Sequence, residues 1–392
     1  MWRRVVVMAA VLALVGAACG DDKKKSASDN TTDTTQAQAG AVAQTYRISV
    51  DNKTDPFTSA FLAYFPNAVT AHPGDSLDFQ GVFTGEPHSV TFGTLVDAGL
   101  AAAEKAGPDA KQEPPELAKI PAMLPQGPGD ANQTAAQPCF LASGDPPADG
   151  GCPKVPQPAF DGRAPMYSSG FLADGEHFTV KLADDLAPGN YRWFCDLHRA
   201  GMTGTLTVVG SSAAADTPDA VASRGAGMLA DFASKLKPIS AQMQAITSPA
   251  KAQAGGGLPD VPGFVAEFGP KNLSVPVGGS VTWDVQGPHT ISFNFPEDAR
   301  TLIAKAPDGS VHLNPKSAAP AGGPGAPEGP PTGKPVAING GKWDGTSFHN
   351  SGVLLGDGPP GSLTYKLTFS RAGTYNYACL VHPDMQGTVK VG

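Results

Sequence analysis

The sequence predicts a mainly β protein made of two β-sandwiches that are joined by a helical linker and carry long Pro/Gly-rich insertions. Residues 72–93 and 168–210 match residues 275–296 and 350–392, so one set of strands occurs twice. Within each set, short segments alternate between apolar and polar residues and are separated by turn residues, which is typical of sandwiches and barrels. Charged residues make up only 16% of the chain, which disfavours long solvated helices.

An export signal is expected at the N-terminus. A short basic start precedes an apolar run over residues 5–18, which is too short to span a bilayer comfortably. Small residues then precede Cys19, and this arrangement resembles a bacterial lipoprotein box, in which the cysteine carries a diacylglycerol anchor. We therefore expect residues 1–19 to be a signal peptide with lipidation at Cys19; an ordinary cleaved signal is the alternative. Residues 20–44 are polar, small and free of aromatic side chains, which predicts a disordered tether.

The two sandwich domains follow in order. The first is expected over residues 45–210 with an insertion over 97–165, and the second over residues 257–392 with an insertion over 297–347. Both insertions are rich in Pro, Gly and Ala, and both are long for loops in a compact domain. Short helices are predicted in them at 97–106 and 298–304. Strands are predicted at 76–79, 178–182, 191–194, 205–209, 280–283, 363–369, 375–377 and 388–391.

The linker over residues 211–256 is expected to be helical. Thr217 followed by Pro218 is typical of an N-cap and a first helical turn. Two apolar stripes lie on either side of Pro238, which predicts two amphipathic helices that pack on one or both sandwiches. A membrane-surface or partner-binding helix is the alternative. The stripes consist of Leu229, Phe232 and Leu236, and of Ile239, Met243 and Ile246.

Cys139 and Cys152 lie close together in the first insertion of a chain that is expected to be exported. Two such cysteines most often pair in an oxidising compartment, so we expect a disulfide between them. A metal role is less favoured, because no histidine lies near either cysteine.

The two remaining cysteines occupy matching places in the repeat. One histidine and one methionine follow each cysteine closely, and a second histidine follows a proline at the end of an earlier strand. A thiolate with two imidazoles and a weak axial thioether is the ligand set of a blue-copper site, so we expect copper (Cu⁺/Cu²⁺), up to two ions per chain. The alternative for each residue alone is ordinary packing in the core. The predicted ligands are His88, Cys195, His198 and Met202 in the first copy, and His289, Cys379, His382 and Met385 in the second.

Both copies resemble cupredoxins of the plastocyanin, amicyanin and azurin group. The segment CLVHPDMQG is similar to the short ligand loop of amicyanin, and YRWFCDLHRAGM is similar to the plastocyanin lead-in, with the His–Met spacing of azurin. PHSV and PHTI resemble the Pro-His-Asn-Val of the family, with Ser89 and Thr290 where an asparagine often ties the ligand loops together. The resemblance implies cupredoxin-like Greek-key β-sandwiches with type 1 copper sites. It covers residues 45–95, 165–210, 262–296 and 348–392.

Composition and motifs exclude several function classes. The formal net charge of −8 does not suit a polyanion, so nucleic-acid binding is excluded, and no phosphate-cradling loop motif occurs. A multicopper oxidase or copper nitrite reductase is rejected. Those families place a histidine beside the cysteine, where Phe194 and Ala378 stand here, and this chain has no His-x-His pair. Two classes remain: an electron-transfer protein that is not an enzyme, and a copper storage, delivery or sensing protein.

Electron transfer is the favoured hypothesis, because complete Cys/His/His/Met sets suit it better than ligand exchange. His198 and His382 are expected to be the solvent-side electron ports, and His88 and His289 the buried ligands. The other histidines are expected to have surface or supporting roles; they are His72, His177, His312 and His349.

The expected partners are redox proteins that dock transiently, and the membrane through the lipid anchor. A docking patch is expected at Leu197, Val381 and Pro383. No nucleic acid and no small-molecule substrate are expected. The expected location is the outer face of the bacterial cell membrane, or the periplasm or the exterior if Cys19 is not lipidated.

Overall fold

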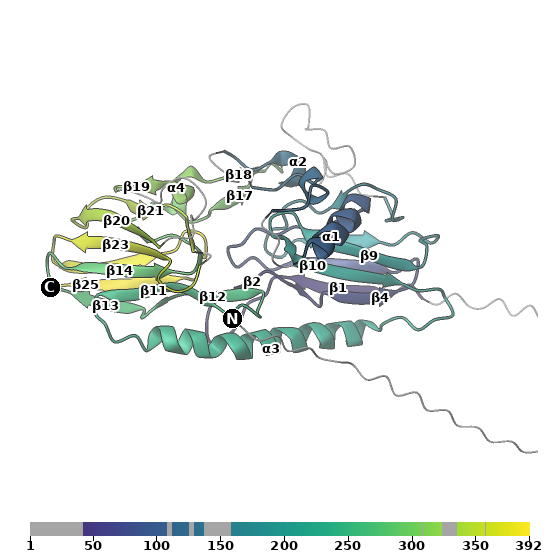
Figure 1. Cartoon of the computed structure of the whole chain (residues 1–392), viewed down its shortest axis with the longest axis horizontal. Helices are drawn as coiled ribbons and strands as arrows, with labels where there is room; N and C mark the ends of the chain where they lie inside the picture. Colours follow the sequence, from purple (N-terminus) through teal and green to yellow (C-terminus); the bar gives the residue numbers. More distant parts are fainter. Residues whose placement is uncertain are drawn as a thin grey trace, which may run out of the picture. The chain divides into compact units, whose positions relative to one another are not determined.

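Two pairs of β-sheets, one pair in each half of the chain, form the frame of the structure (Figure 1). The computed structural model describes residues 42–107, 112–124, 129–136, 158–307, 309–323, 335–356 and 358–392. Within these ranges the chain is mainly β, as predicted. Of the helices in them, none has both the length and the apolar character that crossing a membrane requires. The predicted signal peptide with Cys19, most of the predicted tether and the predicted Cys139–Cys152 disulfide lie outside the described residues.

The first half folds into two sheets with the strand orders β3-β1-β5-β8 and β4-β10-β9-β6-β7. Buried and more exposed residues alternate along β1 and β5, because successive side chains of a strand point to opposite faces. The core centres on Trp193, whose ring packs against Tyr64, Phe79 and Phe92. The strands are β1 Thr45–Val50, β3 Tyr64–Phe65, β4 Ala68–Ala71, β5 Ser76–Gly81, β6 Thr91–Phe92, β7 Tyr167–Ser168, β8 His177–Lys181, β9 Gly189–Cys195 and β10 Arg199–Val208.

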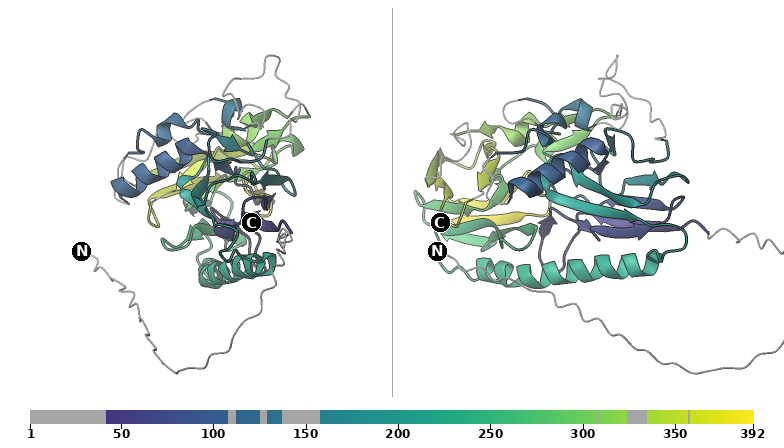
Figure 2. Two further views of the ribbon diagram at one scale, coloured as in Figure 1. Left: turned by 90° about the vertical axis from the view of Figure 1, so that its right-hand side faces the viewer. Right: turned by 45° about the vertical axis from the view of Figure 1, so that its right-hand side comes forward.

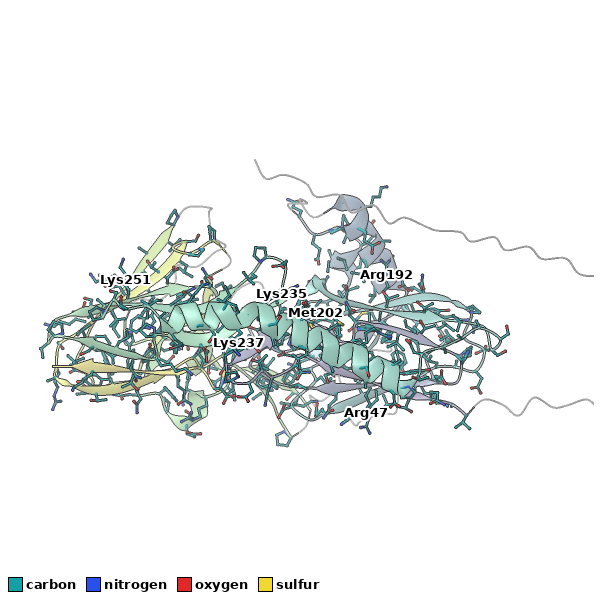
Figure 3. All side chains as sticks on the ribbon, turned by 90° about the horizontal axis from the view of Figure 1, so that it is seen from below. Arg47, Arg192, Met202, Lys235, Lys237 and Lys251 are labelled. Carbon is teal, nitrogen blue, oxygen red and sulfur yellow. The ribbon has the colours of Figure 1, made fainter. Side chains whose placement is uncertain are left out.

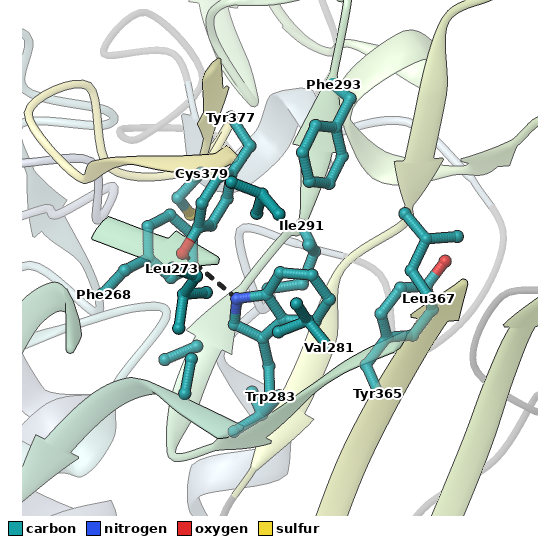
Figure 4. Packing of buried hydrophobic residues seen from close by; sticks show 14 of the residues in the cluster. Phe268, Leu273, Val281, Trp283, Ile291, Phe293, Tyr365, Leu367, Tyr377 and Cys379 are labelled. Carbon is teal, nitrogen blue, oxygen red and sulfur yellow. Dashed lines mark hydrogen bonds between the residues drawn. The ribbon is translucent and has the colours of Figure 1, made fainter. Parts of the chain in front are cut away.

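The second half forms two larger sheets, with the orders β2-β12-β11-β14-β23-β20 and β13-β25-β24-β16-β21-β19. In its core, the indole Nε1 of Trp283 donates a hydrogen bond of 3.2 Å to the hydroxyl of Tyr377 (Figure 4). The strands are β11 Lys251–Gly257, β12 Gly263–Gly269, β13 Asn272–Val275, β14 Ser280–Val285, β16 Ser292–Phe293, β19 Pro320–Ala321, β20 Val336–Trp343, β21 His349–Ser351, β23 Leu363–Phe369, β24 Gly373–Ala378 and β25 Gln386–Val391.

One strand crosses between the two halves. β2, Ser59–Phe61, comes from the first half of the chain but pairs antiparallel with β12 of the second half. The first half thereby covers an edge that would otherwise present unpaired backbone groups. Within residues 43–392, a strand from the first half therefore completes a sheet of the second half, while the two sheets of the first sandwich stay separate from it.

The linker forms one long helix, α3, over Pro218–Gln244, and the prediction of two helices is wrong. The predicted N-cap is confirmed, since Thr217 Oγ1 accepts a hydrogen bond from the backbone of Ala220. Pro238 lies inside the helix, although proline removes one backbone hydrogen bond there. Leu236 and Met243, on either side of Pro238, belong to one buried cluster, and this shared packing keeps the helix continuous.

The apolar face of α3 packs on strands of both halves, which favours the core-packing interpretation over a membrane-surface helix. Figure 3 looks onto this helix from below and labels Lys235 and Lys237 beside it. The predicted linker also contains β11, the strand that pairs in parallel with β14 of the second half.

The described parts of the insertions contain short elements that pack on the sandwiches. The predicted helix at 97–106 lies within α1, Thr94–Ala106, which packs against β9 (Figure 2). The predicted helix at 298–304 is wrong: the single turn η3, Glu297–Ala299, gives way to strand β17 because Ile303 packs in a buried cluster with Val311. The remaining elements are η1 Leu117–Lys119, α2 Gln133–Ala136, β15 Gly287–His289, β17 Ile303–Lys305, β18 Val311–Leu313, α4 Pro315–Ala318 and β22 Leu354–Gly356.

Candidate metal centres

Two groups of potential metal ligands form in the described residues, one in each half of the chain. Within each group, the ligand atoms lie within 4.8 Å of one another. In the first group Cys195 ends β9 and His198 precedes β10, and in the second group Cys379 and His382 lie between β24 and β25. We call His88, Cys195 and His198 site 1, and His289, Cys379 and His382 site 2.

Site 2 has the spacing of a three-donor metal site. Sγ of Cys379 lies 3.8 Å from Nδ1 of His289 and 3.6 Å from Nδ1 of His382, and the two Nδ1 atoms lie 3.1 Å apart. A transition metal about 2.0 Å from each nitrogen and about 2.3 Å from the sulfur fits inside such a triangle. All three residues are at most 2% exposed, so the protein keeps water away from the donors. A thiolate with two imidazoles suits copper.

Site 1 repeats this arrangement. Sγ of Cys195 lies 3.9 Å from Nδ1 of His88. The ring centroids of His88 and His198 are 4.8 Å apart, as are those of His289 and His382. Nδ1 of His198 is buried and has no hydrogen-bond partner, which is costly for a polar atom. A metal bound at Nδ1 would remove that cost. The donor set of site 1 therefore also fits a copper ion.

Met202 and Met385 lie in the buried clusters that contain Cys195 and Cys379, and each methionine is 1% exposed. The backbone closes the second ligand loop through hydrogen bonds from Cys379 N to Met385 O, 3.0 Å, and from Met385 N to His382 O, 3.1 Å. The main chain therefore holds Met385 near the site 2 donors. The axial role of the two methionines stays a prediction.

Hydroxyl groups tie the two ligand segments of each site together. Ser89 Oγ accepts a hydrogen bond of 2.8 Å from the backbone N–H of Asp196, and Thr290 Oγ1 accepts one of 2.7 Å from that of Leu380. Each hydroxyl follows the first histidine, and each N–H follows the cysteine. Ser89 and Thr290 thus connect the two ligand segments of each site.

Backbone N–H groups point at both sulfurs. Ser89 N lies 3.4 Å from Sγ of Cys195, while Thr290 N and Val381 N each lie 3.4 Å from Sγ of Cys379. Burial would raise the pKa of both thiols, but the neighbouring imidazoles hold each well below its usual value. Both sulfurs are therefore prepared to bind as thiolates, the form that ligates metals.

The outer nitrogens of the first histidines meet different groups in the two sites. Nε2 of His88 lies 3.5 Å from Oδ2 of the buried Asp51, whereas Nε2 of His289 lies 3.0 Å from the backbone oxygen of Gln286. The carboxylate of Asp51 also accepts hydrogen bonds from the backbone of Phe61 and from the hydroxyl of Thr84. Site 1 thus has a fixed carboxyl group where site 2 has a neutral carbonyl.

The outer nitrogens of the second histidines converge on one residue, Glu86. Its Oε2 lies 3.6 Å from Nε2 of His198, and its Oε1 lies 3.3 Å from Nε2 of His382. Burial would raise the pKa of Glu86, but contact with the two histidines holds it well below its usual value. Burial would likewise lower the histidine pKa values, but the thiolates and Glu86 raise the pKa of His198 to about 10 and of His382 to about 9.

The expectation that His198 and His382 are solvent-side ports fails for His382. The side chain of His382 is 0% exposed, because Glu86 contacts its Nε2 and the ring of Phe264 packs at 5.4 Å between centroids. The side chain of His198 is 13% exposed and lines a cavity of about 250 Å³ together with Leu62, Phe264 and Leu355.

The expected docking patch is also interrupted. Val381 is only 2% exposed, since it lies in the hydrophobic core of the second half, so it cannot contribute to a surface. Leu197 is partly exposed, and Pro383 is exposed.

Sequence reasoning does not find the buried acids Asp51, Glu86 and Asp196, which lie around the sites. Two of them could have been noticed by comparing the copies, because Glu86 stands where the second copy has Gly287, and Asp196 where it has Leu380. Burial and the Cys195 thiolate raise the pKa of Asp196 to about 7. Asp51 has no comparable signal, since only the fold brings it to His88.

The four other histidines belong to neither site. His177 pairs with Asp78, and His312 with Asp130. His72 contacts a backbone oxygen. His349 is fully buried, and its Nε2 lies 2.7 Å from the hydroxyl of Tyr365.

No family model matches this sequence, and the search of curated proteins finds no match. Among solved structures, auracyanin from Roseiflexus castenholzii is 20% identical, with a TM-score of 0.22, and the match covers 43% of this chain and 99% of that one. A purple cupredoxin from Nitrosopumilus maritimus is 21% identical, with a TM-score of 0.18 over 36% and 99% of the two chains. An azurin from Methylomonas sp. strain J is 15% identical, with a TM-score of 0.22 over 43% and 99%. The chain carries a His-Cys-His group in each half, and the solved structures that it resembles are cupredoxins.

Proposed function

We propose that this protein is an exported copper protein with two type 1 centres, and that it carries single electrons between redox proteins without being an enzyme. The observation that supports this most directly is the duplicated donor triangle. In site 2 its three sides measure 3.1, 3.6 and 3.8 Å. Bound copper would supply a one-electron couple. The same donor set in two copies makes an accidental cluster a poor explanation.

The rigidity of the ligand frame favours electron transfer over copper delivery. The hydroxyls of Ser89 and Thr290 link the ligand segments, and backbone N–H groups orient both sulfurs. Ligands that are fixed and buried change their arrangement little when the charge at the site changes. Delivery or storage, the alternative class, requires ligands that exchange readily, and five of the six donor residues are at most 3% exposed. They are His88, Cys195, His289, Cys379 and His382.

The proposal that the protein is not an enzyme rests on the surroundings of the two sites. Within the described ranges, these two are the groups of His, Cys, Asp and Glu that could hold a metal ion. Phe194 and Ala378 precede the cysteines, so the position from which oxidases reach a second copper is apolar in both copies. The proposed partners are redox proteins that dock transiently, and the proposed location is the outer face of the cell membrane, through lipidated Cys19.

Copper titration with visible absorption tests the proposed function. We expect intense thiolate-to-copper bands at two equivalents of copper, with Cys195→Ser and Cys379→Ser each removing one set. Each variant serves as the control for the other, because it leaves the second site intact. Tight copper binding without such bands would support storage or delivery instead, and no binding at either site would overturn the copper assignment.

A further inference from the structure

We infer that Glu86 couples the two metal centres into one redox unit, in which site 1 passes its electron to site 2. This inference rests on the proposed function, because it needs a metal at both sites. It adds which residue connects the two sites and which site donates the electron.

The contacts around Glu86 form a continuous connection between the sites. In site 2 the Nδ1 atom of His382 faces the thiolate, which leaves its Nε2 to meet Glu86 at 3.3 Å. His198 brings its own Nε2 to the other carboxylate oxygen at 3.6 Å. Each imidazole ring is conjugated from Nδ1 to Nε2. The path from one donor set to the other therefore consists of two rings, one carboxylate and two ion-pair contacts of 3.3 and 3.6 Å.

The backbone is shaped for this connection. Gly85, which precedes Glu86, has φ 127°, a conformation that side-chain-bearing residues rarely adopt. A Cβ on Gly85 would overlap the backbone oxygen of Val381 and the ring of His382. Only glycine lets the chain of the first half approach the second ligand loop so closely. The side chain of Glu86 is consequently 7% exposed between the two halves.

Differences around the two sites set the direction of transfer. The buried carboxylate of Asp51, 3.5 Å from Nε2 of His88, adds negative charge that favours the oxidised, more positive metal at site 1. In site 2 the equivalent nitrogen meets the neutral oxygen of Gln286. Cys379 has two backbone N–H groups directed at its sulfur, and the structure shows one at Cys195. Such donors stabilise the reduced, electron-rich state.

Both differences lower the reduction potential of site 1 relative to that of site 2. With copper bound at both sites, the transfer would move one electron, so the oxidation state at site 1 would rise by one and that at site 2 would fall by one. No bond forms or breaks, and no proton has to move. A one-electron donor protein then reduces site 1 again, and a one-electron acceptor protein oxidises site 2.

The first measurement uses the metal-free protein. Nitrogen NMR of the histidine side chains is expected to show that Glu86→Gln shifts the Nε2 signals of both His198 and His382. Glu267→Gln is the matched control, because Glu267 is also buried, at 3% exposure, and bonds Ser240 away from both sites. It should move neither signal. If Glu86→Gln moves only one of the two signals or none, the bridge does not exist in solution.

The second measurement uses the copper-loaded protein, reduced by less than one electron per chain with a pulse of radiolytic radicals. Wild type should show a first-order absorbance change whose rate does not depend on protein concentration. Glu86→Ala should slow it by about tenfold or more, Glu86→Gln by less, and Glu267→Gln not at all. If both centres form but the Glu86 variants keep the wild-type rate, the bridge is wrong while the proposed function stands. If no blue centre forms, the proposed function itself fails.

The third measurement tests the direction of transfer. Spectroelectrochemistry on Cys379→Ser gives the potential of site 1, and on Cys195→Ser that of site 2. We expect the lower potential at site 1, and we expect Asp51→Asn to raise it while leaving site 2 unchanged. Equal potentials or the reverse order would overturn the direction.

Discussion

Nε2 of His382 lies 3.3 Å from Oε1 of Glu86, although the two residues come from different halves of the chain. This contact covers a histidine for which the sequence predicts a solvent-side position. The second ligand loop thus faces the first half instead of a free surface. Any external partner must therefore approach the two sites through other residues, such as the partly exposed His198.

Replacing Thr290 tests the hydroxyl tie in site 2. Thr290→Val keeps the shape but leaves the buried N–H of Leu380 without its acceptor at 2.7 Å, which should cost about 1–3 kcal/mol of unfolding free energy. Denaturant unfolding measures this loss, and the site 2 absorption band should shift as well. Thr290→Ser, which keeps the hydroxyl, is the control. Equal stability of the two variants would show that the tie contributes nothing.

Copper should stabilise the folded protein. Ligands that bind only the folded state add free energy by mass action, about 4 kcal/mol when the free metal exceeds its dissociation constant a thousandfold. Thermal unfolding with and without copper measures the gain. The Cys195→Ser and Cys379→Ser variants should each keep part of it, and the double variant should keep none. A full gain in the double variant would mean that copper stabilises the protein from another place.

The stability of the first half should fall in acid through Asp216. Burial would raise the pKa of this carboxyl, but Arg224, at 2.7 Å, and the backbone N–H of Thr70 hold it below the ordinary 3.8. A carboxyl with a lowered folded-state pKa contributes stability that is present above pH 3.8 and is lost as pH falls through the folded pKa. Asp216→Asn should therefore cost about 1.5–3 kcal/mol at neutral pH.

Urea unfolding of wild type and Asp216→Asn across this pH range checks the direction of the pH effect. The difference in unfolding free energy between the two proteins should shrink as pH falls below 3.8. Asp231→Asn, which breaks a surface pair with Lys235, should change stability by about 0.5 kcal/mol or less. A difference between wild type and Asp216→Asn that stays constant with pH would contradict the assignment.

Local patterns suffice to predict the repeated strands and the six residues that cluster in the two candidate metal sites. The alternation of apolar and polar residues marks a strand with one buried face. The segments predicted from it at 280–283 and 363–369 lie within β14 and β23. Contacts between distant segments leave no such pattern. The exchange of β2 into the second sheet and the approach of Glu86 to His382 depend on how the halves meet. For the same reason, the exposure of His382 could not be judged from its own ligand loop.

Pro238 shows how packing overrides a local signal, and it supports a last prediction. Proline inside a helix removes a hydrogen bond and costs about 3 kcal/mol in a free helix. Here α3 continues through it, with Leu236 and Met243 both buried in one cluster. Pro238 itself is exposed, so Pro238→Ala should raise the unfolding free energy, by about 1 kcal/mol or more. Denaturant unfolding measures the change, with Ala241→Pro as a control that should destabilise strongly. A loss of stability in Pro238→Ala would mean that the proline fits a bend on which the packing of α3 depends.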